Sequence, residues 1–317
     1  MDTLYIVFYL VIGLVLLVGG AEGLIRGGSS LALSFGVSPL IIGLTLVAFG
    51  TSSPELVVSI KAAVEGNADI SLGNVIGSNI ANIGLILGIA VLIQPVAVRL
   101  QIVKKEIPIM IGFTLLFFVV LLLINVINIF IGIFFLLLLL IYTSYGIYIS
   151  RKEEKSVSAE EMHVGKRLNT WLALLLALGG LAFLAFGADL FLKGAVELAK
   201  RMGVSDIVIG LTIVAVGTSL PELFTTVYAA IKKEADIALG NVVGSNIFNI
   251  LGIIGVASVV NPIQTSSIKL IDLSMMLIFS IAVFVVSKTG LKIQRTEGII
   301  LLSVYLAYVY YLIIITN

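Results

Sequence analysis

The stretch GLTLVAFGTSSPEL, residues 43–56, occurs a second time as GLTIVAVGTSLPEL, residues 210–223. Each copy places one glutamate, Glu55 or Glu222, inside an apolar run, and the two glutamates are 167 positions apart. A carboxylate at membrane depth is costly unless something compensates it, so each glutamate is a candidate functional residue. Two matched carboxylates in an internally duplicated chain predict one cation site shared by both copies.

The repeat continues beyond this motif. ADISLGNVIGSNIANI at 68–83 returns as ADIALGNVVGSNIFNI at 235–250, and 30 of the 53 positions from 43 to 95 are identical at 210–262. A polar loop at 151–169 separates the two copies. The chain therefore divides into a first five-helix repeat at 1–150, the loop, and a second five-helix repeat at 170–317.

The composition is that of a membrane protein. The chain is 60% hydrophobic and 12% charged, with a mean hydropathy of +1.20, whereas soluble domains carry about 25% charged residues. Several apolar runs exceed the roughly 18 residues that identify a membrane-spanning helix. We therefore expect an all-α protein that crosses the membrane many times.

Composition also excludes other classes of protein. The net charge of +1 gives no indication of nucleic-acid binding, and the absence of cysteine excludes disulfides and thiolate-bound metals. The single histidine, His163, lies in the polar loop, and the sequence contains no Ser-His-Asp, zinc or Walker A motif. Neither an enzyme nor an ATP-driven pump is supported.

Hydropathy predicts ten membrane-spanning helices, five in each repeat. They lie at about 3–25, 38–62, 70–93, 106–124, 127–149, 170–192, 205–230, 236–260, 269–287 and 297–315. Because five is odd, the second repeat must enter the membrane in the opposite direction, as in transporters with a central site between inverted repeats. Lys and Arg divide 14 to 5 between the two faces, which places both termini outside and the 151–169 loop in the cytoplasm.

The GTSSPE motif predicts a broken helix. Pro54 has no N–H and its ring clashes with the carbonyl of Gly50, so the helix should break or unwind around residues 48–54. Backbone carbonyls would then join the hydroxyls of Thr51 and Ser52 and the carboxylate of Glu55. Such an all-oxygen set suits hard cations such as Na⁺ and Ca²⁺. The second copy repeats the construction with Thr218, Ser219, Pro221 and Glu222.

The second motif of each copy places amides on one helix face. Asn74, Ser78 and Asn82 are spaced i, i+4 and i+8, as are Asn241, Ser245 and Asn249. We expect Asn82 and Asn249 to line the site. For Asn74, Asn79, Asn241 and Asn246, packing between helices is an equally good interpretation.

Small residues on these helices predict close packing. Glycines spaced at i and i+4 let membrane helices approach each other closely, and they stand at Gly73, Gly77, Gly240 and Gly244. Asp69 and Asp236 open the same two helices and are expected to be their N-caps.

The paired GTSxPE and GSNxxN motifs resemble the two characteristic repeats of the cation/Ca²⁺ exchanger superfamily, and most of all the prokaryotic sodium/calcium exchangers. The resemblance covers nearly the whole chain. It implies ten helices in two inverted halves and Na⁺/Ca²⁺ antiport by alternating access across the cytoplasmic membrane. It also implies that Na⁺ and Ca²⁺ are the transported ions, with no cofactor and no required protein partner.

Site roles follow from the same resemblance. Glu55 and Glu222 would share Ca²⁺, with backbone carbonyls of Thr51 and Thr218 completing its shell. One flanking Na⁺ site would use Ala48, Thr51, Ser78 and Glu222, and the other Ala215, Thr218, Ser245 and Glu55. Asn82 and Asn249 would face the middle.

One position distinguishes this chain from K⁺-dependent relatives, which carry Asp where Asn249 stands. With Asn in both copies, the site holds two formal negative charges, enough for one Ca²⁺ or two Na⁺. The resemblance then implies K⁺-independent exchange at 3 Na⁺ to 1 Ca²⁺, which is electrogenic. An H⁺/Ca²⁺ antiporter of the same superfamily remains the alternative, and a passive cation channel would not need an inverted pair of broken helices.

Overall fold

The computed structural model describes residues 3–154, 168–203, 215–265 and 268–316. In the first half, the helical segments are α1 (Thr3–Phe35), α2 (Pro39–Ile42), η1 (Gly43–Val47), α3 (Ala48–Thr51), α4 (Ser53–Val64), α5 (Ala68–Ala81), η2 (Asn82–Leu87), α6 (Gly88–Ile93), η3 (Ile102–Glu106), α7 (Ile107–Leu123) and α8 (Ile129–Glu154). In the second half, they are α9 (Thr170–Arg201), α11 (Ala215–Gly217), α12 (Leu220–Ile231), α13 (Ala235–Phe248), η6 (Asn249–Ile253), α14 (Ile254–Val260), α15 (Leu270–Lys288) and α16 (Arg295–Thr316). The η segments are π-helical.

The structure is an all-α membrane protein. Within the described residues, eight helices are long and apolar enough to cross a membrane, and the bent pair Pro39–Thr51 and Ser53–Val64 makes a ninth span. The remaining expected span, 205–230, lies partly outside the described residues. Its described part ends in the apolar helix α12, which is too short to cross a bilayer alone.

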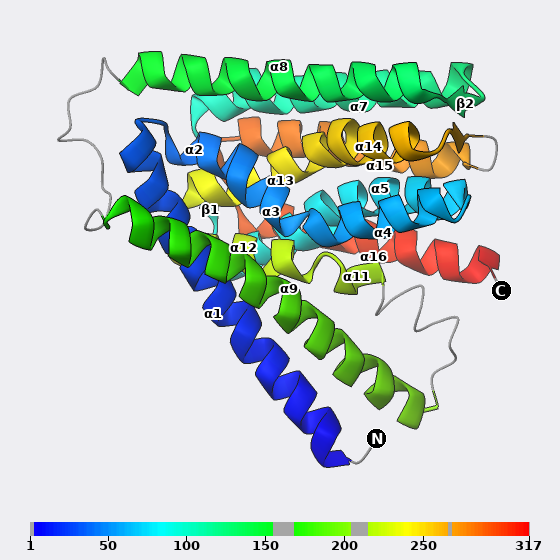
Figure 1. Cartoon of the computed structure of the whole chain (residues 1–317), viewed down its shortest axis with the longest axis horizontal. Helices are drawn as coiled ribbons and strands as arrows, with labels where there is room; N and C mark the ends of the chain where they lie inside the picture. Colours follow the sequence, from blue (N-terminus) through cyan, green and yellow to red (C-terminus); the bar gives the residue numbers. More distant parts are fainter. Residues whose placement is uncertain (1–2, 155–167, 204–214, 266–267, 317) are drawn as a thin grey trace.

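Helices α1 and α9 pack on each other along a seam of glycines, and Figure 1 shows them extending together away from the other helices. A Cβ on Gly20 would lie 2.8 Å from the carbonyl oxygen of Gly180, and one on Gly187 would lie 2.9 Å from that of Gly13. Each contact joins a glycine of one half to a glycine of the other, and Gly180 and Gly187 follow Gly13 and Gly20 by 167 positions. The first helices of the two halves are therefore in backbone contact, which small residues allow.

Several of the remaining helices pack on a helix of the other half, and we call these exchanged pairs. Helix α8 packs on α14, and α16 packs on α6. The segments that carry the amide motifs, 68–93 and 235–260, are the most buried of the long spans. They form the centre of the molecule, with α13 beside α5 and η2.

Four short strands also join the two halves, because each strand of one half pairs with a strand of the other. Strand β1 (Val96–Ala97) pairs antiparallel with β4 (Lys292–Ile293), and β2 (Val126–Ile127) pairs with β3 (Ile263–Gln264). Val96 lies opposite Ile293, and Val126 lies opposite Gln264. Figure 1 places β1 and β2 at opposite ends of the helices. Each end of the molecule therefore has one loop of each half in a small two-stranded sheet.

The expected N-caps at Asp69 and Asp236 are wrong. Both helices begin one residue earlier, after Asn67 and Glu234, and neither of those residues makes a side-chain cap bond. Asp236 instead forms an ion pair with Arg99, whose Nε lies 2.9 Å from Oδ2. A carboxylate in the first helical turn is still favoured by the helix dipole, without acting as the cap.

Candidate cation site

The helix expected to break does so at Ser52. The segment Pro39–Thr51 is bent by 48° from Ser53–Val64, and Ser52 has φ −80° and ψ 9°. Ser219 has nearly the same backbone conformation, φ −89° and ψ 9°, before α12. Glu55 and Glu222 therefore each lie in the first turn of a new helix, where the dipole favours a carboxylate.

The two carboxylates are held across the boundary between the halves. The Ser52 hydroxyl donates to Oε1 of Glu222 at 2.7 Å, and the Ser219 hydroxyl donates to Oε1 of Glu55 at 3.0 Å. Glu55 is 1% exposed and Glu222 is 2% exposed. The two motifs, far apart in sequence, thus form one buried site.

Several buried oxygens of the two repeated motifs have no hydrogen-bond partner among the described residues. They are Oε2 of Glu55, Oε2 of Glu222, Oδ1 of Asn82, Oδ1 of Asn249 and Oγ of Ser245. Buried polar atoms are normally hydrogen-bonded, so each unsatisfied oxygen requires an explanation. Carboxylate, amide and hydroxyl oxygens are the ligands that hard cations take, and bound Na⁺ or Ca²⁺ would satisfy them together.

The amides of the second motif are oriented by one another. Nδ2 of Asn82 donates to Oδ1 of Asn246, and Nδ2 of Asn249 donates to Oδ1 of Asn79, each at 3.1 Å. Because these bonds occupy the amide nitrogens, the oxygens of Asn82 and Asn249 stay available for a cation. Asn79 and Asn246 bond Met276 and Met110 in turn, which favours a supporting role over direct contact with an ion.

Asn74 and Asn241 support the helix that follows each break. Nδ2 of Asn74 donates to the backbone carbonyl of Glu55 at 3.0 Å, and Nδ2 of Asn241 donates to that of Glu222 at 3.4 Å. The Thr51 hydroxyl also donates to Oδ1 of Asn241 at 3.1 Å. The broken helix of the first half therefore lies directly against the amide face of the second.

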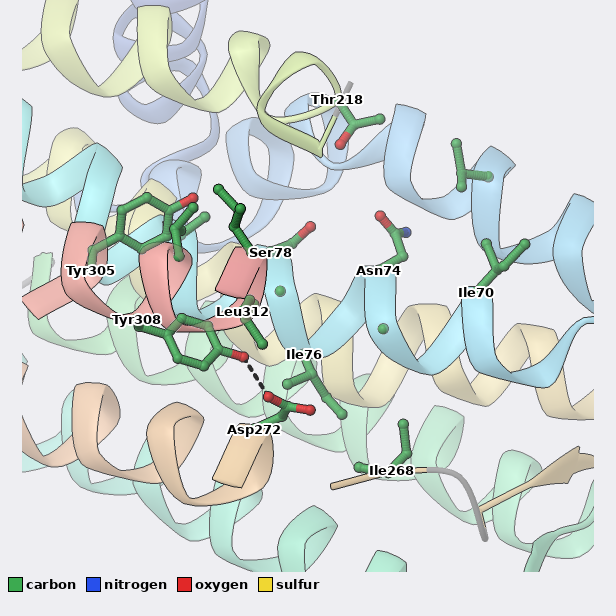
Figure 2. Close-up of a pocket in the computed structure, with 16 residues that line it drawn as sticks. Ile70, Asn74, Ile76, Ser78, Thr218, Ile268, Asp272, Tyr305, Tyr308 and Leu312 are labelled. Atoms are coloured by element: carbon green, nitrogen blue, oxygen red, sulfur yellow. Dashed lines mark hydrogen bonds between the residues drawn. The ribbon is translucent and has the colours of Figure 1, made fainter. Parts of the chain in front are cut away.

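The two sides of the site differ in accessibility. A cavity of about 570 Å³ reaches Asn74, Ser78 and Thr218 (Figure 2). The matched cavity on the other side is about 310 Å³ and is lined by residues of η1 and by Phe49. A Cβ on Gly244 would lie 2.6 Å from the carbonyl oxygen of Leu44, whereas one on Gly77 would meet no atom of the described residues within 4 Å.

Gly240 and Gly244 show the expected close packing, whereas for Gly73 and Gly77 no such contact is found among the described residues.

The predicted site residues gather as follows. Ala48, Thr51, Ser78 and Ser245 are buried, and Thr218 borders the larger cavity. Ala215 begins α11, directly after the undescribed residues 204–214, and nothing is known of its side chain. No group of three or more His, Cys, Asp or Glu gathers within the described residues.

Sequence reasoning missed Asp272, which also lines the larger cavity, and the sulfurs of Met110 and Met276 beside the amides. The available signal was their spacing, since Met276 follows Met110 by 166 positions, close to the repeat offset.

Comparisons with known proteins give matches over nearly the whole chain. The sequence model of the family described as sodium/calcium exchanger protein matches residues 5–148 and 172–314. The chain is 38% identical over 312 residues to the putative antiporter CaxA of Alkalimonas amylolytica, covering 96% of this chain and 97% of that protein. It is 34% identical over 340 residues to the sodium/calcium exchanger MaX1 of Methanosarcina acetivorans, covering 94% and 96%.

The fold is also similar to solved structures. The sodium-calcium exchanger NCX_Mj soaked with zero Na⁺ and Ca²⁺ matches with a TM-score of 0.84 and 33% sequence identity, covering 98% of this chain and 99% of that chain.

Proposed function

This chain belongs to the sodium/calcium exchanger family, and on that premise we propose that it is a secondary antiporter exchanging Na⁺ for Ca²⁺ by alternating access. The observation that carries the proposal is that Glu55, Glu222, Asn82, Asn249 and Ser245, all in the repeated motifs, each have a buried oxygen without a hydrogen-bond partner among the described residues. A site made only of oxygens, with two carboxylates and no soft ligand, selects Na⁺ and Ca²⁺ over transition metals.

Competition for the two carboxylates gives exchange. One Ca²⁺ or two Na⁺ neutralise Glu55 and Glu222, so the two ions exclude each other from the centre. Without an ion, two buried carboxylates remain uncompensated, which disfavours movement of the empty site through the membrane. Asn82 and Asn249 add no charge, which supports K⁺-independent exchange and a third, uncompensated Na⁺ in each cycle.

We assign the ligands accordingly. Glu55, Glu222 and the backbone carbonyls of Thr51 and Thr218 bind Ca²⁺. The flanking Na⁺ sites are Ala48, Thr51, Ser78 and Glu222 on one side and Ala215, Thr218, Ser245 and Glu55 on the other. The hydroxyls of Ser52 and Ser219 donate their protons to the carboxylates and hold them in place. The lone pairs of the same hydroxyl oxygens remain available to the ion.

Two inverted five-helix halves, 1–150 and 170–317, are the architecture we propose around this site. The exchanged partners α8·α14 and α16·α6 support it, as do the strand pairs at opposite ends of the molecule. Both termini then lie outside the cytoplasmic membrane and the 151–169 loop lies inside.

In this arrangement the structure is open to the outside. The larger cavity is lined by Leu312 and Ile313, next to the end of α16, so it opens on the face that carries the C-terminus. On the opposite side, η1 packs against α13 with backbone contact at Gly244, and the cavity there is smaller. Alternating access requires the reverse arrangement in the second state, with the outer side closed and the inner side open.

Flux into proteoliposomes tests the coupling ion. Vesicles should take up ⁴⁵Ca²⁺ when an outward Na⁺ gradient is imposed. They should not take it up when only an outward H⁺ gradient is imposed. Uptake driven by H⁺ alone would establish the H⁺/Ca²⁺ alternative, and uptake without either gradient would indicate a channel. Glu55→Gln and Glu222→Gln should each abolish exchange, because either change leaves a single carboxylate for a divalent ion.

The same vesicles test the stoichiometry. Three Na⁺ leaving for one Ca²⁺ entering moves one net positive charge outward, so a membrane potential that is positive inside should accelerate uptake. A rate independent of the potential would contradict the 3:1 ratio. Replacing K⁺ by choline in vesicles without an imposed potential should leave the rate unchanged.

A further inference from the structure

Two acidic residues outside the repeated motifs form a second matched pair. Asp272 follows Glu106 by 166 positions, and each accepts a hydrogen bond from a tyrosine. The Tyr142 hydroxyl donates to Oε2 of Glu106 at 2.8 Å, and the Tyr308 hydroxyl donates to Oδ1 of Asp272 at 2.7 Å. The two tyrosines are also 166 positions apart. The carboxylate–tyrosine pair is thus duplicated, although neither copy belongs to the central site.

Asp272 lines the same cavity that reaches the central site. Figure 2 shows Asp272 and Tyr308 on one wall, and Asn74 and Thr218 on the other. Asp272 is the charged side chain among the described residues that line this cavity, and it is partly exposed. Its Oδ2 accepts no hydrogen bond from a described residue. The Tyr308 bond occupies Oδ1, so a cation in this mostly apolar cavity would be bound by Oδ2.

The cavity is large enough for an ion that keeps its water. A water molecule occupies about 30 Å³ of liquid, so a Ca²⁺ with about eight waters needs roughly 240 Å³. The cavity holds about 570 Å³. A hydrated cation can therefore stand beside Asp272 without being stripped of its shell.

The counterpart cavity on the opposite side is smaller. Tyr142 lines the smaller cavity, which Leu44, Thr45 and Phe49 narrow to about 310 Å³. Glu106 is buried, at 7% exposed. If the second state opens this side, Glu106 comes to line a cavity like the one that Asp272 lines here.

We propose that Asp272 forms a vestibule site that binds a hydrated Na⁺ or Ca²⁺ before the ion loses its water at Glu55 and Glu222, and that Glu106 does the same at the opposite face. The proposal rests on the exchange function proposed above. A single charge between low-dielectric walls focuses the field and raises the local cation concentration. One carboxylate cannot compensate full dehydration, so the vestibule ion keeps most of its water.

A purely structural role is the competing explanation. The Tyr308–Asp272 bond ties α16 to α15, and the Tyr142–Glu106 bond ties α8 to η3. The two explanations separate through substitutions that remove either the charge or the bond. Asp272→Asn removes the charge and keeps an oxygen acceptor, whereas Tyr308→Phe removes the hydroxyl and keeps the charge.

Sided flux measurements test the proposal. Right-side-out and inverted membrane vesicles carrying the wild type, Asp272→Asn, Tyr308→Phe or Glu106→Gln are compared for initial Na⁺-driven ⁴⁵Ca²⁺ uptake against Ca²⁺ concentration. Asp272→Asn should raise the half-saturating Ca²⁺ concentration about tenfold when Ca²⁺ is presented at the C-terminal face, and leave it unchanged at the other face. Glu106→Gln should show the reverse, and Tyr308→Phe should resemble the wild type.

Equilibrium ⁴⁵Ca²⁺ binding to the purified protein gives a readout that does not depend on transport. The wild type should bind one tight and one weak Ca²⁺, Asp272→Asn only the tight one, and Glu222→Gln only the weak one. The vestibule site would be overturned if Asp272→Asn still bound the weak Ca²⁺, or if it raised the half-saturating Ca²⁺ concentration equally at both faces. It would also be overturned if Tyr308→Phe behaved like Asp272→Asn. Wild-type protein without Na⁺-driven uptake would refute the exchange function, while loss of weak binding in Asp272→Asn would still support this site.

Discussion

At the scale of single residues, the central feature is a hydroxyl from one half bonded to a carboxylate from the other. Ser52 and Ser219 each donate to one oxygen of a glutamate, and the second oxygen of each glutamate has no partner among the described residues. A hydrogen bond to a charged group contributes about 1.5–3 kcal/mol. These two bonds therefore set the orientation in which Glu55 and Glu222 would bind the proposed ion.

Ser52→Ala should weaken Ca²⁺ binding, because Oε1 of Glu222 loses its donor and the carboxylate loses its fixed orientation. We expect the half-saturating Ca²⁺ concentration to rise about tenfold, which corresponds to about 1.4 kcal/mol. Equilibrium ⁴⁵Ca²⁺ binding measures the effect. Ser258→Ala is the matched control, since its buried hydroxyl bonds only carbonyls of its own helix. Equal affinities of Ser52→Ala and the wild type would show that the cross-bond is dispensable.

The carboxylates could be predicted from sequence, whereas their partners could not. A charged residue in an apolar run marks Glu55 and Glu222 on composition alone. The bond between Ser52 and Glu222 joins residues 170 positions apart, and periodicity along a helix says nothing about such a contact. Asp272 escaped notice because it lies outside the nearly identical motifs and its partner is on another helix.

At the scale of elements, the breaks could be predicted and the π-helical segments could not. Pro54 and Pro221 stand in the first turns after Ser52 and Ser219, as expected where a helix restarts. The segments η2 and η6 begin at Asn82 and Asn249 themselves. A π-helical turn depends on how the segment packs, and such turns are frequent at functional sites.

Helix α13 packs on η1 at one side of the site. The equivalent glycines Gly244 and Gly77 allow this contact to be tested. Gly244→Ala would place its Cβ 2.6 Å from the Leu44 carbonyl oxygen, whereas Gly77→Ala meets no described atom within 4 Å. Overpacking costs about 1–3 kcal/mol, so Gly244→Ala should lower the thermal midpoint of the purified protein by several degrees.

Gly77→Ala should leave the midpoint close to that of the wild type. The comparison controls for the chemical change itself, because both substitutions add one methyl group at equivalent positions of the repeat. Similar midpoints for the two variants would mean that the backbone contact at Gly244 does not stabilise the packing of α13 on η1.

At the scale of the whole molecule, the halves are interlocked. The glycine seam between α1 and α9, the exchanged helix pairs and the two strand pairs all join one half to the other. The duplication and the odd number of spans could be read from the sequence, and they predict the inversion. Which helices exchange partners could not be read, because apolar membrane helices carry little directional information apart from their small residues.

The proposed inversion predicts that β1·β4 and β2·β3 lie on opposite faces of the membrane. The chain contains no cysteine, so single cysteines can report each face separately. Ala97 and Gln264 are both exposed, one in each strand pair. In right-side-out vesicles, a membrane-impermeant maleimide should label Gln264→Cys directly and Ala97→Cys only after permeabilisation, because positively charged loops stay in the cytoplasm. Labelling of both variants from the same face would contradict inverted halves, and labelling of Ala97→Cys alone would retain the inversion but reverse the orientation of the chain.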